Sequence, residues 1–214
     1  MYDIKAMKNL KPSYNKNLIY ARLGYDKKRT ELSDEMHDEV EKLINKAENT
    51  LSLTGAYRIM GVAQIDTPRV ILGDGTILSG VKLSELMKDC DQALIMLATG
   101  GSKIMELINR LQTEGKMSEA VVIDAAASEI TDSVLDMVML HVGQMLRNKG
   151  RVLTKMRFSP GYGDFDIEQQ KELYRLMNGE SFGMTLNEAC LLLPEKSVLA
   201  IAGISGGYND QERI

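Results

Sequence analysis

The nine residues RFSPGYGDF, from Arg157 to Phe165, are the part of the chain best suited to bind a small ligand. Pro160 fixes its own φ and favours an extended Ser159 before it, and the two glycines that follow let a ligand approach the backbone closely. Arg157 adds a permanently charged, planar fork of N–H donors that matches a carboxylate. These residue types predict a loop that binds a carboxylate-bearing ligand.

The same nine residues are also typical of a plain Pro-Gly turn after a strand. In that interpretation Arg157 lies on the surface and Tyr162 packs into the core. Spacing alone does not decide between the two.

A second glycine-rich turn, Gly100-Gly101-Ser102, lies between a predicted buried strand and a predicted helix. Free N–H groups at a helix N-terminus can bind an anion, and an ordinary strand-to-helix turn is the alternative. Neither Gly-x-Gly-x-x-Gly nor Gly-x-x-x-x-Gly-Lys-Ser/Thr is present, so the sequence carries no nucleotide-binding signature.

Catalytic groups and metal ligands are sparse. The only histidines, His37 and His141, lie far apart on predicted helices, and no cysteine pair has ligand spacing. No Gly-x-Ser-x-Gly motif accompanies them. We therefore predict no catalytic residue and no metal site. Cys90 and Cys190 are expected to be buried free thiols, as in a reducing compartment.

Hydrophobic periodicity predicts the elements that position these residues. Helices are expected over Ser33–Ala47, Leu83–Asp89, Ser102–Leu111, Ser118–Asn148 and Ile167–Met177. Strands are expected over Ala56–Val62, Arg69–Leu72, Thr76–Leu78, Ala93–Thr99 and Arg151–Phe158, and a final strand pair over Leu191–Leu193 and Val198–Ile204. Gly206-Gly207 is expected to end the ordered structure.

Composition indicates a cytoplasmic globular protein. A chain of 214 residues is long enough for one sizeable core and short for two. The net charge of −4 shows no basic footprint for nucleic acid. The longest apolar stretch is Ala93–Ala98, far shorter than the roughly 20 residues of a membrane helix, and the N-terminus is too polar for a signal peptide. We expect neither a nucleic-acid nor a membrane partner.

The pattern Arg-x-x-x-Gly-Tyr, formed by Arg157, Gly161 and Tyr162, resembles the S-adenosylmethionine signature of the C-terminal reactivation domain of cobalamin-dependent methionine synthase. The order RFSPGYGDF, DIEQQKELYRLMN and MTLNEACLLLPEKSVLAIAGI is similar to stand-alone proteins related to that domain. DCDQALIMLATGGSKIMELINRL and VVIDAAASEITD resemble them too. The likeness covers most of residues 20–205. Residues 1–19 are then an N-terminal arm that lies against the body or a partner, and residues 206–214 a C-terminal tail.

The resemblance implies a single-domain α+β fold with a central, largely antiparallel twisted sheet flanked by helices. It also implies S-adenosylmethionine as the ligand. Arg157 and Ser159 stand where the family contacts this ligand, and Gly161 and Tyr162 complete the motif. Asp164 belongs to the stand-alone pattern. Its carboxylate would favour a nearby sulfonium or ammonium, or it would cap a turn.

One position departs from the family. The methionine synthase domain has tyrosines near Val198 and Leu199, and one of them lines the ligand site. Here Lys196 or Ser197 would replace its polar contacts, unless both belong to a surface loop.

The chain also lacks Asp-x-His-x-x-Gly, the pattern whose histidine ligates cobalamin in corrinoid proteins. Cobalamin would therefore arrive on a partner, a separately encoded methionine synthase or another corrinoid protein. The function implied is an accessory subunit for reductive methylation of that cobalamin, inactive alone and served by an electron donor such as flavodoxin or ferredoxin. The alternative is a non-catalytic S-adenosylmethionine sensor or a docking protein of another corrinoid methyltransferase system.

Overall fold

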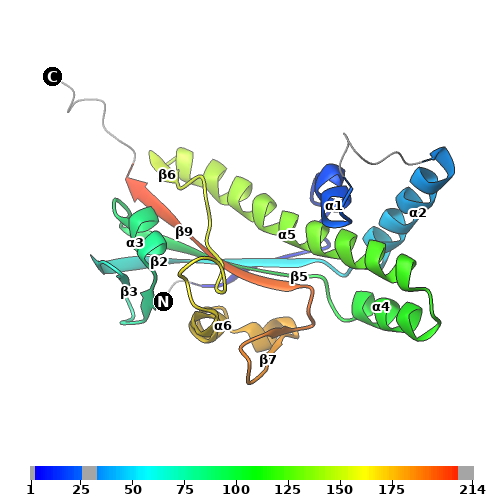
Figure 1. The fold of residues 1–214 in the computed structure, drawn as a ribbon. Helices are drawn as coiled ribbons and strands as arrows, with labels where there is room; N and C mark the ends of the chain where they lie inside the picture. The colour runs from blue at the N-terminus through cyan, green and yellow to red at the C-terminus, as the bar shows by residue number, and fades with distance from the viewer. Residues whose placement is uncertain (1–2, 26–32, 207–214) are drawn as a thin grey trace.

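An antiparallel sheet runs through the middle of the protein, with helices on both faces (Figure 1). This computed structural model describes residues 3–25 and 33–206. The strand order is β4-β3-β2-β5-β9-β6, and β1 also pairs with β2. The strands are β1 (Lys5–Lys8), β2 (Thr54–Asp66), β3 (Arg69–Leu72), β4 (Ile77–Ser79), β5 (Gln92–Thr99), β6 (Arg151–Leu153) and β9 (Ser197–Gly206).

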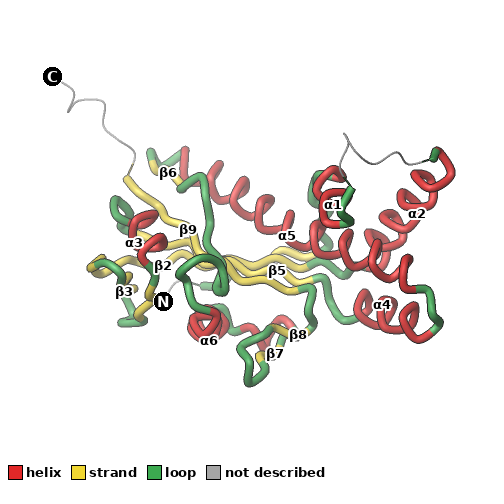
Figure 2. Tube along the Cα trace, in the orientation of Figure 1, coloured by secondary structure: helices red, strands yellow, loops and turns green. Residues whose placement is uncertain are grey.

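Helices cover the sheet unequally, as Figure 2 shows. On one face α5 (Met117–Arg147) packs on the sheet, and α1 (Lys16–Arg22), α2 (Asp34–Thr50) and α4 (Lys103–Thr113) pack against α5. The opposite face carries α3 (Val81–Met87), the short turns η1 (Ile167–Gln169) and η2 (Gly179–Phe182), α6 (Gln170–Leu176), and the hairpin of β7 (Thr185–Leu186) and β8 (Leu192–Leu193).

Strand β5 separates two hydrophobic cores. Leu94, Met96 and Ala98 point to the core under α5, whereas alternate residues point to the core under α3 and α6. A strand covered on both faces buries all its side chains, which explains the apolar run from Ala93 to Ala98.

The predicted fold class is confirmed, and most predicted elements lie where the periodicity places them. The side chain of Ser33 accepts a hydrogen bond from the Met36 N–H at 3.3 Å, so α2 has the expected start. Gly150 follows α5 with a φ of +64°, a left-handed conformation that ends the helix. No helix among the described residues is long and apolar enough to cross a membrane.

The N-terminal segment, predicted to be an arm, is part of the sheet and of the core. Its Lys5–Lys8 strand pairs with β2, and Ile19 of α1 is fully buried. Of the predicted C-terminal tail, residues 207–214 lie outside the described residues.

The prediction of one continuous strand from Arg151 to Phe158 is wrong. Strand β6 stops at Leu153, and Phe158 rejoins β9 through two backbone hydrogen bonds with Ile201, at 2.8 and 2.9 Å. At the break the Thr154 hydroxyl accepts the Gly203 N–H at 3.0 Å and donates to the Met156 carbonyl at 2.9 Å. The Thr154 N–H still donates to the Gly203 carbonyl at 2.9 Å, but the Thr154 side chain replaces the return backbone bond, and residues 155–157 loop out of the sheet.

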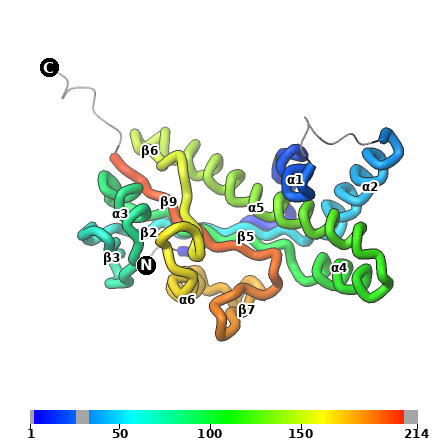
Figure 3. The backbone as a smooth tube through the Cα atoms, in the orientation of Figure 1, coloured from blue at the N-terminus to red at the C-terminus, as the bar shows by residue number. Residues whose placement is uncertain are grey.

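The predicted final strand pair also differs from the structure. Strand β8 pairs with β7, whereas β9 lies between β5 and β6 in the main sheet, along the orange-to-red path in Figure 3. Periodicity identifies strands, and partners depend on the packing of the whole sheet.

Candidate functional site

A cavity of about 740 Å³, here called the main cavity, lies between the signature loop (residues 157–165), α5 and the start of β9. Three of the five predicted site residues line it, namely Arg157, Ser159 and Tyr162. The other lining residues are Arg22, Ser128, Thr131, Asp132, Lys155, Met156, Phe158, Pro160, Gln170, Glu195, Lys196, Ser197 and Val198.

Arg157 is tied to two carboxylates of α5. Its Nη2 lies 2.9 Å from Oδ2 of Asp132, and its Nη1 donates to Asp136 one turn further along the helix. Burial by itself would lower the pKa of Arg157, but the two carboxylates outweigh burial and raise that pKa above its ordinary value. Both terminal nitrogens of Arg157 therefore already have carboxylate partners within the chain. The Arg-x-x-x-Gly-Tyr pattern does not reveal these ion pairs.

The signature loop is a compact turn anchored at its end. The Gly161 N–H donates to the Phe165 carbonyl at 2.7 Å, and the Phe165 N–H donates to the Tyr162 carbonyl at 3.1 Å. Gly161 has a φ of +89°, which favours glycine. Phe165 is fully buried, whereas Tyr162 is 70% exposed at the main cavity. The alternative of a core-packed Tyr162 is excluded.

Asp164 lies away from the main cavity and caps a distant helix. Its Oδ2 accepts hydrogen bonds from the Val81 and Lys82 N–H groups, at 2.5 and 3.2 Å. These are the first two N–H groups of α3, which lack partners within the helix. This position differs from the expected ligand contact and from a cap of its own turn. Gly161 likewise shapes the loop without lining the cavity.

We therefore expect Asp164→Ala to lower the free energy of unfolding by about 0.5–2 kcal/mol, the usual cost of losing a helix cap. Affinity for a ligand of the main cavity should stay within about twofold, since a site that keeps all its contacts loses little free energy. Chemical denaturation and equilibrium titration measure the two effects. A large loss of affinity at unchanged stability would mean that Asp164 contacts the ligand and does not act only as a helix cap.

The segment before β9 contributes polar groups as well. Lys196 is buried, and its Nζ lies 2.7 Å from Oδ1 of Asp124 and 2.9 Å from Oγ of Ser128. Oγ of Ser197 lies 2.8 Å from Oγ1 of Thr99. Lys196 is thus an internal ion-pair partner, and the surface-loop alternative does not hold for it.

Val198 lines the main cavity, whereas Leu199 is fully buried in the core on the other face. Only Val198 therefore occupies a position from which an aromatic ring would reach a ligand. Nearby, Oγ1 of Thr131 is buried without a hydrogen-bond partner among the described residues.

Sequence reasoning missed the contribution of α5 to the main cavity. Asp124, Ser128, Asp132 and Asp136 recur every four residues, so they share one face of the helix. This polar stripe was a usable signal, and two of its members, Ser128 and Asp132, line the main cavity. It pairs with Lys196 and Arg157, which come from distant segments.

The Gly100-Gly101 turn uses its N–H groups internally. The Gly100 N–H donates to the Lys196 carbonyl at 2.7 Å, and the Gly101 N–H donates to Oγ1 of Thr99 at 3.2 Å. A Cβ at Gly100 would lie 2.5 Å from Cδ2 of Leu51. These two N–H groups are therefore not available to an anion, and the turn serves close packing.

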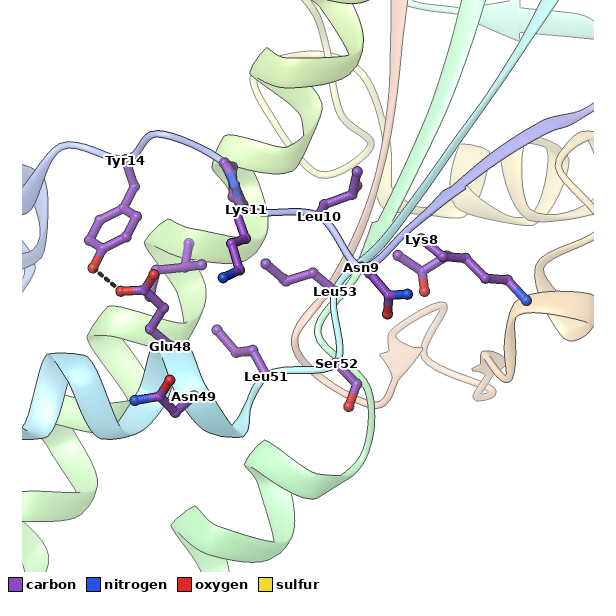
Figure 4. A pocket seen from close by; sticks show the side chains of 13 residues that line it. Lys8, Asn9, Leu10, Lys11, Tyr14, Glu48, Asn49, Leu51, Ser52 and Leu53 are labelled. Atoms are coloured by element: carbon purple, nitrogen blue, oxygen red, sulfur yellow. Dashed lines mark hydrogen bonds between the residues drawn. The ribbon is translucent and has the colours of Figure 1, made fainter.

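A second cavity, of about 430 Å³, lies where the N-terminal segment crosses the end of α2 (Figure 4). The Tyr14 hydroxyl donates to Glu48 at 2.8 Å, and burial together with this bond raises the pKa of Tyr14. Its wall combines three leucines with mostly polar residues, and none of the signature loop lines it. It is separate from the predicted site.

No group of three metal-ligating side chains occurs among residues 3–25 and 33–206. The His37 ring stacks on Tyr20 and lies 2.9 Å from its hydroxyl oxygen, and His141 lies beside Tyr57. Cys90 and Cys190 are both buried and free, as expected.

The chain matches no protein-family model, and no curated protein matches its sequence. Among solved structures it is similar to the crystal structure of the MetH reactivation domain bound to AdoHcy, with a TM-score of 0.71 and 13% sequence identity. The match covers 94% of this chain and 78% of that one. The protein therefore has the fold of the MetH reactivation domain.

Proposed function

We propose that the protein binds S-adenosylmethionine in the main cavity and serves reductive methylation of cobalamin on a separately encoded methionine synthase. One observation carries this proposal. The Arg-x-x-x-Gly-Tyr loop lines a cavity in a fold whose solved relative binds AdoHcy, the demethylated form of S-adenosylmethionine.

The cavity suits such a ligand in size and in chemistry. Its volume of about 740 Å³ falls within the usual range for small-molecule sites, about 300–1,000 Å³. Exposed Tyr162 offers an aromatic face at the mouth, and acidic Asp132 and Glu195 lie on the wall. Carboxylates on the wall attract the sulfonium and ammonium of the ligand.

Methyl transfer from a sulfonium asks little acid–base catalysis of the protein, because the methyl group is already activated. The contribution of this chain is to hold the donor in position against a nucleophile carried by the partner. The sparse catalytic groups of the sequence agree with that role. An electron donor such as flavodoxin or ferredoxin would supply the one electron that returns oxidised cobalamin to its nucleophilic state.

We expect the purified protein to bind S-adenosylmethionine in a calorimetric titration. Mixed with a cobalamin-loaded partner and a one-electron reductant, it should accelerate conversion of the cob(II)alamin absorption spectrum to that of methylcobalamin. The matched control omits S-adenosylmethionine. Binding without acceleration across methionine synthase and other corrinoid partners would favour the sensor or docking alternative, and no binding would reject the proposed site.

A further inference from the structure

The cations around the main cavity differ in how far they are already paired. Arg157 contacts two carboxylates, and buried Lys196 contacts Asp124 and Ser128. The two remaining cations on the wall are Arg22 and Lys155. A ligand carboxylate meets less competition at these two positions.

Arg22 comes from the last turn of α1 and lies where two cavities meet. It lines the main cavity and a neighbouring cavity of about 350 Å³, and Ser128 is also common to both. Among the described residues, Arg22 contacts one acidic group, with its Nε 3.4 Å from Oε2 of Glu129. Both Nη groups have no acceptor among the described residues, and the side chain is 47% exposed.

Glu129 is a weak competitor for this arginine. It is 7% exposed, and burial raises its pKa, an effect that Arg22 opposes and that Asp132 and Asp136 reinforce. The one long contact involves Nε of Arg22. It leaves the two Nη groups available, and these can form two parallel hydrogen bonds with a carboxylate.

We propose that Arg22 binds the carboxylate of the ligand in the main cavity, which makes helix α1 part of the binding site. The inference rests on the proposed function, since S-adenosylmethionine supplies the carboxylate. Arg22 is preferred over Lys155 because its planar guanidinium can form two parallel hydrogen bonds with one carboxylate. The ammonium of a lysine binds a carboxylate as a flexible point charge.

The test pairs variants with two ligands that differ by the carboxylate alone, S-adenosylmethionine and decarboxylated S-adenosylmethionine. Arg22→Ala should weaken binding of S-adenosylmethionine by about tenfold, the effect of one partly exposed charged hydrogen bond. Its affinity for the decarboxylated ligand should match that of the parent. Arg22→Lys, which keeps the charge, should lose less.

Arg110→Ala is the matched control, because Arg110 is also an exposed arginine in the last turn of its helix and lines none of these cavities. It should bind both ligands like the parent. Thermal melts of all variants identify any folding defect, and Arg22→Lys keeps the test valid if Arg22→Ala unfolds.

Equal losses for both ligands, or no loss for either, would overturn the role of Arg22 while the proposed function stands on the parent's binding. A loss confined to S-adenosylmethionine in Lys155→Ala and absent in Arg22→Ala would assign the carboxylate to Lys155 instead. A parent that binds neither ligand overturns the proposed function and this inference together.

Discussion

Replacing Phe165 by alanine is expected to lower the free energy of unfolding by about 3–5 kcal/mol, the range for large aromatic truncations in a core. Phe165 is fully buried among the side chains between the sheet, α3 and α6. Its backbone closes the signature loop through hydrogen bonds with Gly161 and Tyr162. The truncation therefore leaves a cavity where the loop is anchored, and it should also weaken binding in the main cavity.

Urea denaturation of the variant beside the parent measures the loss of stability. Tyr162→Ala is the control within the same loop, because this ring is 70% exposed and its removal should change stability by less than about 0.5 kcal/mol. Equal stabilities of Phe165→Ala and the parent would mean that the loop is not anchored in the core as described.

Arg157→Ala is expected to weaken binding of S-adenosylmethionine by about ten- to hundredfold, if losing a charged hydrogen bond between Arg157 and α5, about 1.5–3 kcal/mol, is felt in full at the cavity. The structure gives this effect a different cause from direct contact with the ligand. Removal of Arg157 leaves Asp132 and Asp136 without the cation that lies between them. It also removes the ion pairs that join the signature loop to α5. Affinity for the ligand should fall because the signature loop and α5, which both line the main cavity, are no longer held together by Arg157.

This cause predicts that Arg157→Ala weakens S-adenosylmethionine and the decarboxylated ligand alike, in contrast to Arg22→Ala. Titration of both ligands, with a thermal melt to exclude unfolding, distinguishes the two arginines. Arg157→Lys should recover part of the affinity, since it keeps the charge and loses the fork. A variant that melts normally and binds as tightly as the parent would remove Arg157 from the site.

The sequence by itself determined most of the local elements, and its resemblance to the reactivation domain implied the fold class. Helix α2 begins at Asp34 directly after its predicted cap Ser33, and the apolar run from Ala93 to Ala98 belongs to the doubly covered strand at the centre of the sheet. These features depend on the chemistry of neighbouring residues, which periodicity and capping express directly. The turn at residues 157–165 was predictable for the same reason.

Only the tertiary structure decided which groups meet at the site. Arg157 pairs with carboxylates 21 and 25 residues away, and Asp164 caps a helix 83 residues earlier. Arg22 reaches Glu129 across 107 residues. Such pairings follow from how helices pack on the sheet and from the break that Thr154 makes after β6, because a local pattern carries no information about distances across the fold.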